Sequence, residues 1–335
     1  MTFTHILVTA VTAIAFTSIL GIWLIPFLRK LKYGQTILEI GPSWHKNKQG
    51  TPTMGGIMFV FGILVASIAG MATYILGNNG ELSESSLKIT KLVVSLVMAI
   101  AFGLVGFIDD YIKVVKKQNL GLTARQKSLF QITVAVVYLA ALYALGDTST
   151  TFIIPFIGQF DFGILYYPVC VFIIVGCVNA VNLTDGIDGL ASSVTFVSAI
   201  SLFVMSALLY NEGMKILSIA LAGGCLGFLI WNFHPAKVFM GDTGSLFLGG
   251  IVVAIAFGLG LPFILIFVGI IYIIETLSVI LQVISFKTTG KRIFKMSPIH
   301  HHFEMSGYSE EKIVLLFSIV QLIGCILGIW AVTRM

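Results

Sequence analysis

Long apolar runs separated by short polar segments make up most of the chain. A helix needs about 20 apolar residues to cross the hydrocarbon core of a bilayer. Few segments alternate between apolar and polar residues, so helices are favoured over a β-barrel. The pattern therefore predicts an all-α integral membrane protein with ten transmembrane helices. The predicted spans are residues 5–28, 56–77, 89–108, 128–146, 163–181, 189–210, 215–232, 244–260, 262–286 and 312–332.

One predicted span and one loop have features of their own. The run 262–286 contains Glu275 and Gln282, so we expect it to bend or break. Burial between helices is the simplest explanation for Glu275. The segment 147–162 alternates β-branched and aromatic residues around Pro155, which predicts a small hairpin or an interfacial turn.

The composition excludes a water-soluble fold. Of 335 residues, 57% are hydrophobic and 10% are charged, whereas soluble domains are about 25% charged. The four cysteines lie in apolar stretches and suggest neither a disulfide framework nor a metal site. The net charge of +5 gives no reason to expect nucleic acid, because basic residues in a membrane protein first report its topology. We expect one transmembrane domain over 1–335.

The basic residues indicate an orientation. If the loops alternate and the N-terminus lies outside, 16 of the 20 Lys and Arg residues fall on the inner side. Cytoplasmic loops carry an excess of such residues. The distribution therefore predicts that both termini are extracytoplasmic. The exceptions are Lys88, Lys91, Lys215 and Arg334.

Polar residues gather at the predicted cytoplasmic ends of the spans, a pattern expected of a composite active site in a cleft on that face. Asp109 and Asp110 end the third predicted span, either as a helix stop or as functional carboxylates. Asp242 lies in a glycine turn before the eighth span, where it is either a helix cap or a Mg²⁺ ligand. The five segments are 52–56 (PTMGG), 109–110 (DD), 182–190 (NLTDGIDGL), 239–245 (FMGDTGS) and 297–304 (SPIHHHFE).

Two further segments carry candidate ligands. Asn182, Asp185 and Asp188 share one face if their segment is helical, and a simple helix cap would need only one of them. The triplet 300–302 does not have the usual spacing of zinc ligands, and it suits phosphate binding or acid–base chemistry better. Carboxylates, basic residues, a divalent cation and a membrane surface together suit phosphoryl transfer between a nucleotide and a lipid.

These motifs closely resemble those of the polyprenyl-phosphate N-acetylhexosamine-1-phosphate transferase superfamily, through essentially the whole chain. The sequences PTMGG and PIHHHFE resemble those of its muramoyl-pentapeptide branch. The motifs on which the resemblance rests are residues 50–56 (GTPTMGG), 107–113 (FIDDYIK), 182–190 (NLTDGIDGL), 238–245 (VFMGDTGS) and 298–304 (PIHHHFE).

The resemblance implies a Mg²⁺-dependent enzyme of the bacterial plasma membrane, with a cytoplasmic active site and a homodimeric assembly. Its substrates would be UDP-N-acetylmuramoyl-pentapeptide and undecaprenyl phosphate, and UMP would be released. By motif, Asp109 and Asp110 are the catalytic pair, Asp242 is a catalytic metal ligand and His300 is the essential histidine. The implied substrate-binding residues are Lys48, Thr53, Lys117, Arg125, Asn182, Asp185, Asp188, Phe239, Gln282, His301 and His302.

Two alternatives remain at this point. A sister enzyme would transfer N-acetylglucosamine-1-phosphate to a polyprenyl phosphate. A membrane transporter is the alternative from another class, although transporter sites usually lie near the midplane of the membrane.

Overall fold

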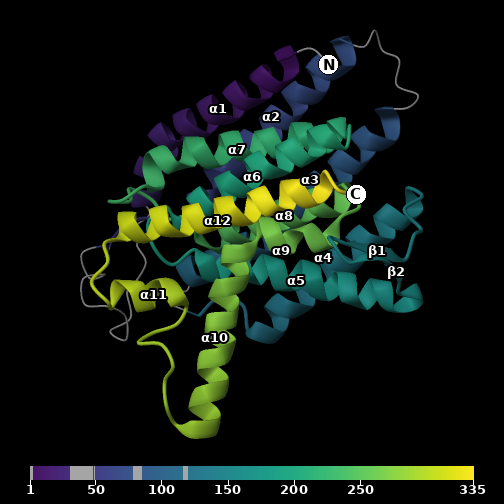
Figure 1. Cartoon of the computed structure of the whole chain (residues 1–335). Helices are drawn as coiled ribbons and strands as arrows, with labels where there is room; N and C mark the ends of the chain where they lie inside the picture. The colour runs from purple at the N-terminus through teal and green to yellow at the C-terminus, as the bar shows by residue number, and fades with distance from the viewer. Residues whose placement is uncertain (1–2, 31–47, 49, 78–84, 116–119) are drawn as a thin grey trace.

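A computed structural model of the chain describes residues 3–30, 48, 50–77, 85–115 and 120–335 (Figure 1). Within these residues, ten helices are long and apolar enough to cross a membrane, as the hydropathy pattern predicted. The long helices are α1 (Phe3–Lys30), α2 (Gly56–Gly77), α3 (Ser85–Val115), α4 (Ala124–Ala144), α5 (Tyr166–Thr184), α6 (Leu190–Leu208), α7 (Glu212–Asn232), α8 (Gly241–Gly258), α10 (Ile270–Thr289) and α12 (Glu310–Val332).

Helix α8 forms the centre of the bundle. All of its residues from Thr243 to Gly258 are buried, and α2, α3, α5, α6 and α7 pack against it. Glycines allow these close contacts, since a Cβ on Gly250 would lie 3.2 Å from the Cα of Ala99 in α3. The N-terminal end of α8 is thereby held at a depth and rotation that its neighbours determine.

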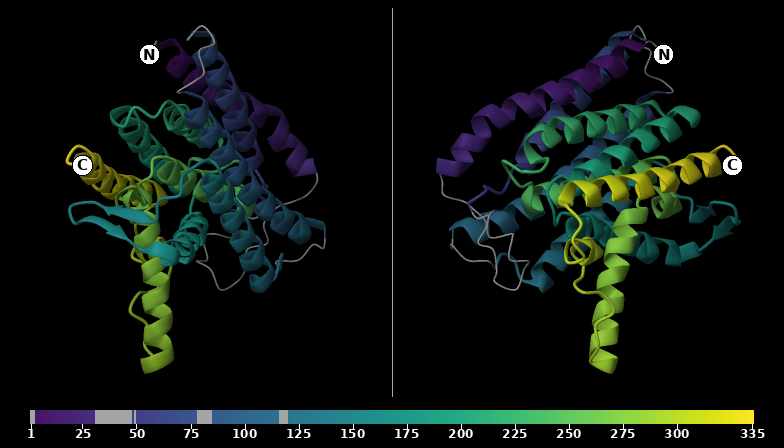
Figure 2. Two further views of the ribbon diagram at one scale, coloured as in Figure 1. Left: turned by 90° about the vertical axis from the view of Figure 1, so that its right-hand side faces the viewer. Right: turned by 60° about the vertical axis from the view of Figure 1, so that its left-hand side comes forward.

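The predicted ninth span is broken, as expected, but the break lies before Glu275 and Gln282, the residues from which it was expected. The 3₁₀ helix η3 (Pro262–Ile264) leads into the short α9 (Leu265–Val268), and α10 begins after Gly269. Helix α10 alone projects away from the other helices (Figure 2). The single helix over 262–286 that the hydropathy pattern would allow is therefore replaced by three elements, and only α10 is long enough to span.

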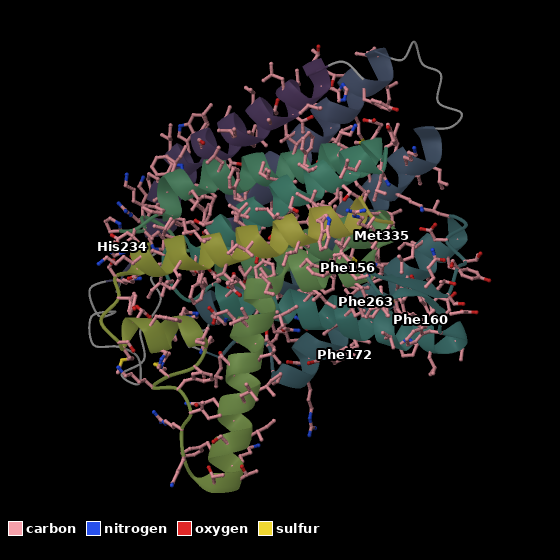
Figure 3. The ribbon with its side chains drawn as sticks, in the orientation of Figure 1. Phe156, Phe160, Phe172, His234, Phe263 and Met335 are labelled. Carbon is pink, nitrogen blue, oxygen red and sulfur yellow. The ribbon has the colours of Figure 1, made fainter. Side chains whose placement is uncertain are left out.

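One end of the bundle carries both termini and the hairpin (Figure 1). The hairpin consists of the antiparallel strands β1 (Thr151–Ile154) and β2 (Gly158–Asp161), which confirms the prediction for 147–162. The 3₁₀ helix η2 (Gly163–Leu165) connects it to α5. His234 lies at the opposite end (Figure 3), near the short helix α11 (Ile299–Glu304).

The structure corrects the prediction for the third span. Helix α3 does not stop at Asp109 and Asp110 but continues to Val115. Lys113 supplies the reason, because it lies one turn beyond Asp109 and pairs with that carboxylate (Nζ to Oδ2, 2.5 Å). Both aspartates are therefore presented from within a helix.

Candidate active site

Three carboxylates from α3 and α8 meet at the end of the bundle opposite the termini. Oxygens of Asp109, Asp110 and Asp242 all lie within 4.8 Å of one another. Helix α3 can approach α8 this closely because residue 106 is glycine; a Cβ there would lie 2.1 Å from the carbonyl oxygen of Asp242. Two segments that are far apart in sequence thus build one acidic cluster.

Asp110 is bound to the start of α8. Its Oδ1 accepts a hydrogen bond from the backbone N–H of Asp242 (3.2 Å). Its Oδ2 accepts the backbone N–H (2.9 Å) and the hydroxyl (2.7 Å) of Thr243. A carboxylate at a helix N-terminus satisfies N–H groups that have no partner within the helix. Asp110 therefore caps α8 from a neighbouring helix, which holds Asp242 in place.

Asp109 and Asp242 face lysines. Lys113 Nζ lies 2.9 Å from Asp242 Oδ2, and Lys127 Nζ lies 3.0 Å from the same oxygen. Asp109 Oδ1 accepts the backbone N–H of Leu122 (2.8 Å). Lys113 and Lys127 were placed only in a general basic region by the sequence. The position of Lys113, four residues after Asp109, was the available signal for it.

The segment 182–190 is not a single helix, so the condition under which its polar residues would share one face is not met. Helix α5 ends at Thr184, and α6 begins after Gly189, which has a positive φ of 76° and no capping side chain. Asn182 donates from Nδ2 to Asp242 Oδ1 (2.9 Å). Asp188 instead contacts a second group of residues. The turn between α5 and α6 thus separates the side chains of Asn182 and Asp188.

Asp185 lies between these two groups, in the loop 185–189. Within the part of the chain that the structure describes, its side chain has no hydrogen-bond partner or ion pair. Burial, reinforced by the carboxylates of Asp242, Asp110 and Asp188, raises the pKa of Asp185 to about 8. The side chain is therefore largely protonated at neutral pH and can act as a hydrogen-bond donor.

The second group is a charged network around Asp188. Lys48 Nζ contacts Asp188 Oδ1 (2.7 Å) and Glu310 Oε2 (2.6 Å). Asp188 Oδ2 accepts the backbone N–H of Ala236 (2.9 Å) and lies 3.1 Å from His234 Nδ1. The sequence analysis placed Lys48 and Asp188 together as substrate-binding residues. It missed His234 and Glu310, which stand outside the recognised motifs.

The segment 52–56 packs beside the turn that precedes α8. The N–H of Phe239 donates to Pro52 O (2.9 Å), and Gly55 N–H donates to Phe239 O (2.8 Å). Residue 56 must be small, because a Cβ there would lie 2.3 Å from the Cα of Gly244. This pairing places Thr53 and Phe239 next to the acidic cluster.

The histidine triplet forms α11 and its members differ in burial. His300 is completely buried, with Nδ1 3.1 Å from Glu275 Oε1. His301 Nδ1 lies 2.6 Å from Glu304 Oε2, and His302 Nδ1 accepts the N–H of Lys295 (3.2 Å). The structure thus brings His300 to a partner on α10 and not to the three carboxylates.

Three remaining candidates have different surroundings. The amide of Gln282 holds the backbone of 293–294: Oε1 accepts two N–H groups (both 2.9 Å), and Nε2 donates to Phe294 O (2.9 Å). Arg125 is exposed in the first turn of α4. Lys117 lies outside the described residues.

The acidic cluster fits a divalent cation by its chemistry. Its donors are carboxylate oxygens, which Mg²⁺ prefers together with phosphate oxygens of a substrate. Lysine ammonium groups now neutralise Asp242 and Asp109 from one side. The same ammonium groups suit the phosphate groups of a substrate that would arrive with the cation.

Comparisons with known proteins agree with this chemistry. The model of Glycosyl transferase family 4 matches residues 92–260, and a phospho-N-acetylmuramoyl-pentapeptide-transferase signature matches residues 48–60. Curated proteins named phospho-N-acetylmuramoyl-pentapeptide-transferase are similar over nearly their full length. The protein from Bacillus subtilis (strain 168) is 48% identical over 329 residues, and that from Halalkalibacterium halodurans is 49% identical over 327, each covering 97% of both chains. The protein from Clostridium perfringens (strain 13 / Type A) is 46% identical over 324 residues, covering 96% of this chain and 97% of its own.

Proposed function

Because the chain belongs to the family of phospho-N-acetylmuramoyl-pentapeptide-transferases, we propose that it performs the reaction in that name during peptidoglycan synthesis. The substrates are UDP-N-acetylmuramoyl-pentapeptide and undecaprenyl phosphate. An oxygen of the lipid phosphate bonds to the phosphorus that carries the sugar, and the bond from that phosphorus to UMP breaks. The observation that carries this proposal is the full-length similarity, and the acidic cluster with its lysines agrees with it.

The two adjacent aspartates have different roles in this proposal. Asp109 orients the lipid phosphate or takes its proton, because its oxygens contact the Leu122 N–H and the Lys113 ammonium and do not cap α8. Asp110 holds Asp242 and the start of α8. This division is supported by the hydrogen bonds of each carboxylate.

Asp242 is the proposed ligand of Mg²⁺, with Asp109 within reach. When bound, the cation supplies positive charge that stabilises the diphosphate and the departing UMP. Lys113 and Lys127 then neutralise phosphate oxygens, and Asn182 orients Asp242 through its amide.

The remaining motif residues are assigned to the substrates. Lys48, Asp188 and Phe239 flank the nucleoside side of the cleft, together with Thr53 and Asp185. Gln282 acts indirectly, since its amide holds the loop 293–294. The substrate-binding assignment extends to Lys117, Arg125, His301 and His302. His300 is the proposed essential histidine of the catalytic group.

The proposed location is the bacterial plasma membrane, with the acidic cluster in a cleft on the cytoplasmic face and both termini outside. The separation of basic residues supports this orientation. The chain would act as a single transmembrane catalytic domain, 1–335, in a homodimer. The three carboxylates of the acidic cluster lie near the end of α3 and at the start of α8, which argues against a transporter with a site at the midplane.

The test is UMP release by the purified protein with undecaprenyl phosphate and each of two UDP-sugars. We expect release with UDP-N-acetylmuramoyl-pentapeptide and little with UDP-N-acetylglucosamine. The reverse preference would favour the sister enzyme. Full turnover in excess chelator would refute the metal requirement.

A further inference from the structure

A buried acid and a buried histidine face each other beneath the active site. Glu275 of α10 and His300 of α11 both have 0% exposure, and Glu275 Oε1 lies 3.1 Å from His300 Nδ1. Ionisable residues inside a membrane protein are costly and are rarely retained for packing alone. The sequence explained Glu275 by burial between helices, and the structure gives it a specific partner.

The pair is incompletely satisfied. Within the described part of the chain, Glu275 Oε2 and His300 Nε2 are buried without a hydrogen-bond partner. A buried polar atom without a partner is destabilising. Apolar residues of similar volume would be at least as stable in such a place. Stability therefore does not account for this arrangement.

The other edge of the histidine ring contacts the loop that carries two proposed substrate ligands. A Cβ on Gly186 would lie 2.1 Å from His300 Nε2 and 2.5 Å from Cε1. Gly186 stands between Asp185 and Ile187, two residues before Asp188. The imidazole is thus packed directly on the backbone of this loop, in space that a side chain at 186 would fill.

We propose that Glu275 is a positioning residue that acts through His300. It accepts the Nδ1–H of His300, which fixes the tautomer and the plane of the ring. The ring edge then supports the backbone at Gly186 and sets the positions of Asp185 and Asp188. This inference rests on the proposed function for its kinetic effect, but the hydrogen bond itself can be tested without activity.

Kinetics and stability of two variants give the first test. Glu275→Gln keeps an acceptor oxygen, whereas Glu275→Leu removes it. We expect kcat/KM for the UDP-sugar to fall in the order wild type, Gln, Leu, by about 10- to 100-fold for Leu, the range seen when a carboxylate that orients a histidine is lost. The KM for the UDP-sugar should rise, while the KM for undecaprenyl phosphate stays unchanged. The thermal midpoint of Glu275→Leu should fall, because His300 Nδ1 is left buried without its partner, whereas Glu275→Gln keeps an acceptor and should stay closer to the wild type.

Gly186→Ala should reproduce the kinetic defect, since its Cβ displaces the ring from the loop. The double variant Gly186→Ala/Glu275→Leu should be little worse than the more severe single variant, because both break the same contact. Ser278→Ala is the matched control: it removes a buried hydroxyl that binds Glu275 O (2.6 Å) on the same helix, and kcat/KM should stay near wild type.

The second test reads the hydrogen bond directly. Full-length protein with ¹⁵N-labelled histidines contains six such side chains, and the His300 signals are identified by their loss in His300→Gln. We expect a proton on Nδ1 in the wild type and a mixture of tautomers in Glu275→Leu. A proton on Nε2 alone in the wild type overturns the proposal. A wild-type kcat/KM for the UDP-sugar in Glu275→Leu also overturns it. If the wild type releases no UMP, the proposed function fails, and the nitrogen spectra still decide on the pair.

Discussion

At the scale of single residues, neighbours with identical chemistry acquire different roles from their contacts. Asp109 and Asp110 follow each other in α3, yet Asp110 is fixed by three donors at the start of α8. Asp109 accepts one backbone N–H and pairs with Lys113. Asp109 is therefore the carboxylate that is better placed to exchange its partner for a substrate.

Asp109→Asn should lower kcat by about 100-fold or more, the lower end for loss of a general base. Binding of the UDP-sugar should stay near wild type, because this carboxylate is assigned to the lipid phosphate. Initial rates of UMP release and calorimetry of UDP-sugar binding measure the two effects. Loss of nucleotide binding with unchanged turnover per bound complex would refute the assignment.

Asp242→Asn should weaken binding of the UDP-sugar in the presence of Mg²⁺ and should abolish the difference between titrations with and without the cation. The physical reason is that Asp242 would help to hold the cation, whose charge would favour binding of the diphosphate. Calorimetry under both conditions is the measurement. Unchanged Mg²⁺-dependent binding would place the metal elsewhere. A labelled phospho-aspartate formed without lipid would instead indicate a two-step reaction.

Asp185 gives a prediction for pH. Its pKa in the folded protein is raised to about 8 from 3.8, so the folded state retains a proton that the unfolded chain releases at lower pH. The group therefore destabilises the protein progressively as pH rises from about 4 to 8. The thermal midpoint of Asp185→Asn should therefore exceed that of the wild type by a difference that grows as the pH rises from 5 to 8.5. Thermal unfolding in detergent without divalent cations measures this, and a constant difference across that range would contradict it.

At the scale of elements, a broken helix requires new partners for its backbone. Between α9 and α10, Gln321 of α12 fills this need. Its Oε1 accepts the N–H of Ile271 (3.2 Å), and its Nε2 donates to Val268 O (2.6 Å) and to Ser198 Oγ (3.0 Å). Irregular backbone at membrane depth is tolerated only where such groups are satisfied within the protein.

Gln321→Leu should destabilise the protein by about 1–3 kcal/mol for each backbone group left without a partner. The thermal midpoint in detergent, compared at one scan rate, should fall clearly. Leu322→Ala is the control, because Leu322 is 49% exposed on the same helix. Equal midpoints for Gln321→Leu and the wild type would show that the break is stabilised by other contacts.

At the scale of the whole molecule, the two ends of the bundle differ in chemistry. His234 of the Lys48 network lies at the end opposite the hairpin and both termini (Figures 1 and 3). The acidic cluster lies near the end of α3 and at the start of α8. The basic residues predict that the end with the clusters is cytoplasmic. With the proposed orientation, a soluble nucleotide would reach the same site as a lipid phosphate.

Cysteines introduced at Lys291 and at Gln159 should therefore be labelled from opposite sides of the membrane. Both positions are exposed. An impermeant thiol reagent added to intact cells should label Gln159→Cys, and Lys291→Cys should react only after the membrane is opened. The wild type is the control for its native cysteines, of which Cys170, Cys225 and Cys325 are buried. The opposite pattern would invert the proposed orientation.

The ten spans, the weak ninth span and the hairpin were all predictable from the sequence, because the bilayer imposes a length and an apolar composition that can be read locally. The motif residues were also recognisable, and the structure gathers Asp109, Asp110, Asp242 and Asn182 as a group. Other features depend on side chains that are distant in sequence. Only the tertiary structure decided that α3 continues past Asp110, that Asp188 faces Lys48 and Glu310, and that Glu275 meets His300. Local sequence patterns specify which residues enter the bilayer, whereas the packing of neighbouring helices determines which polar groups come into contact.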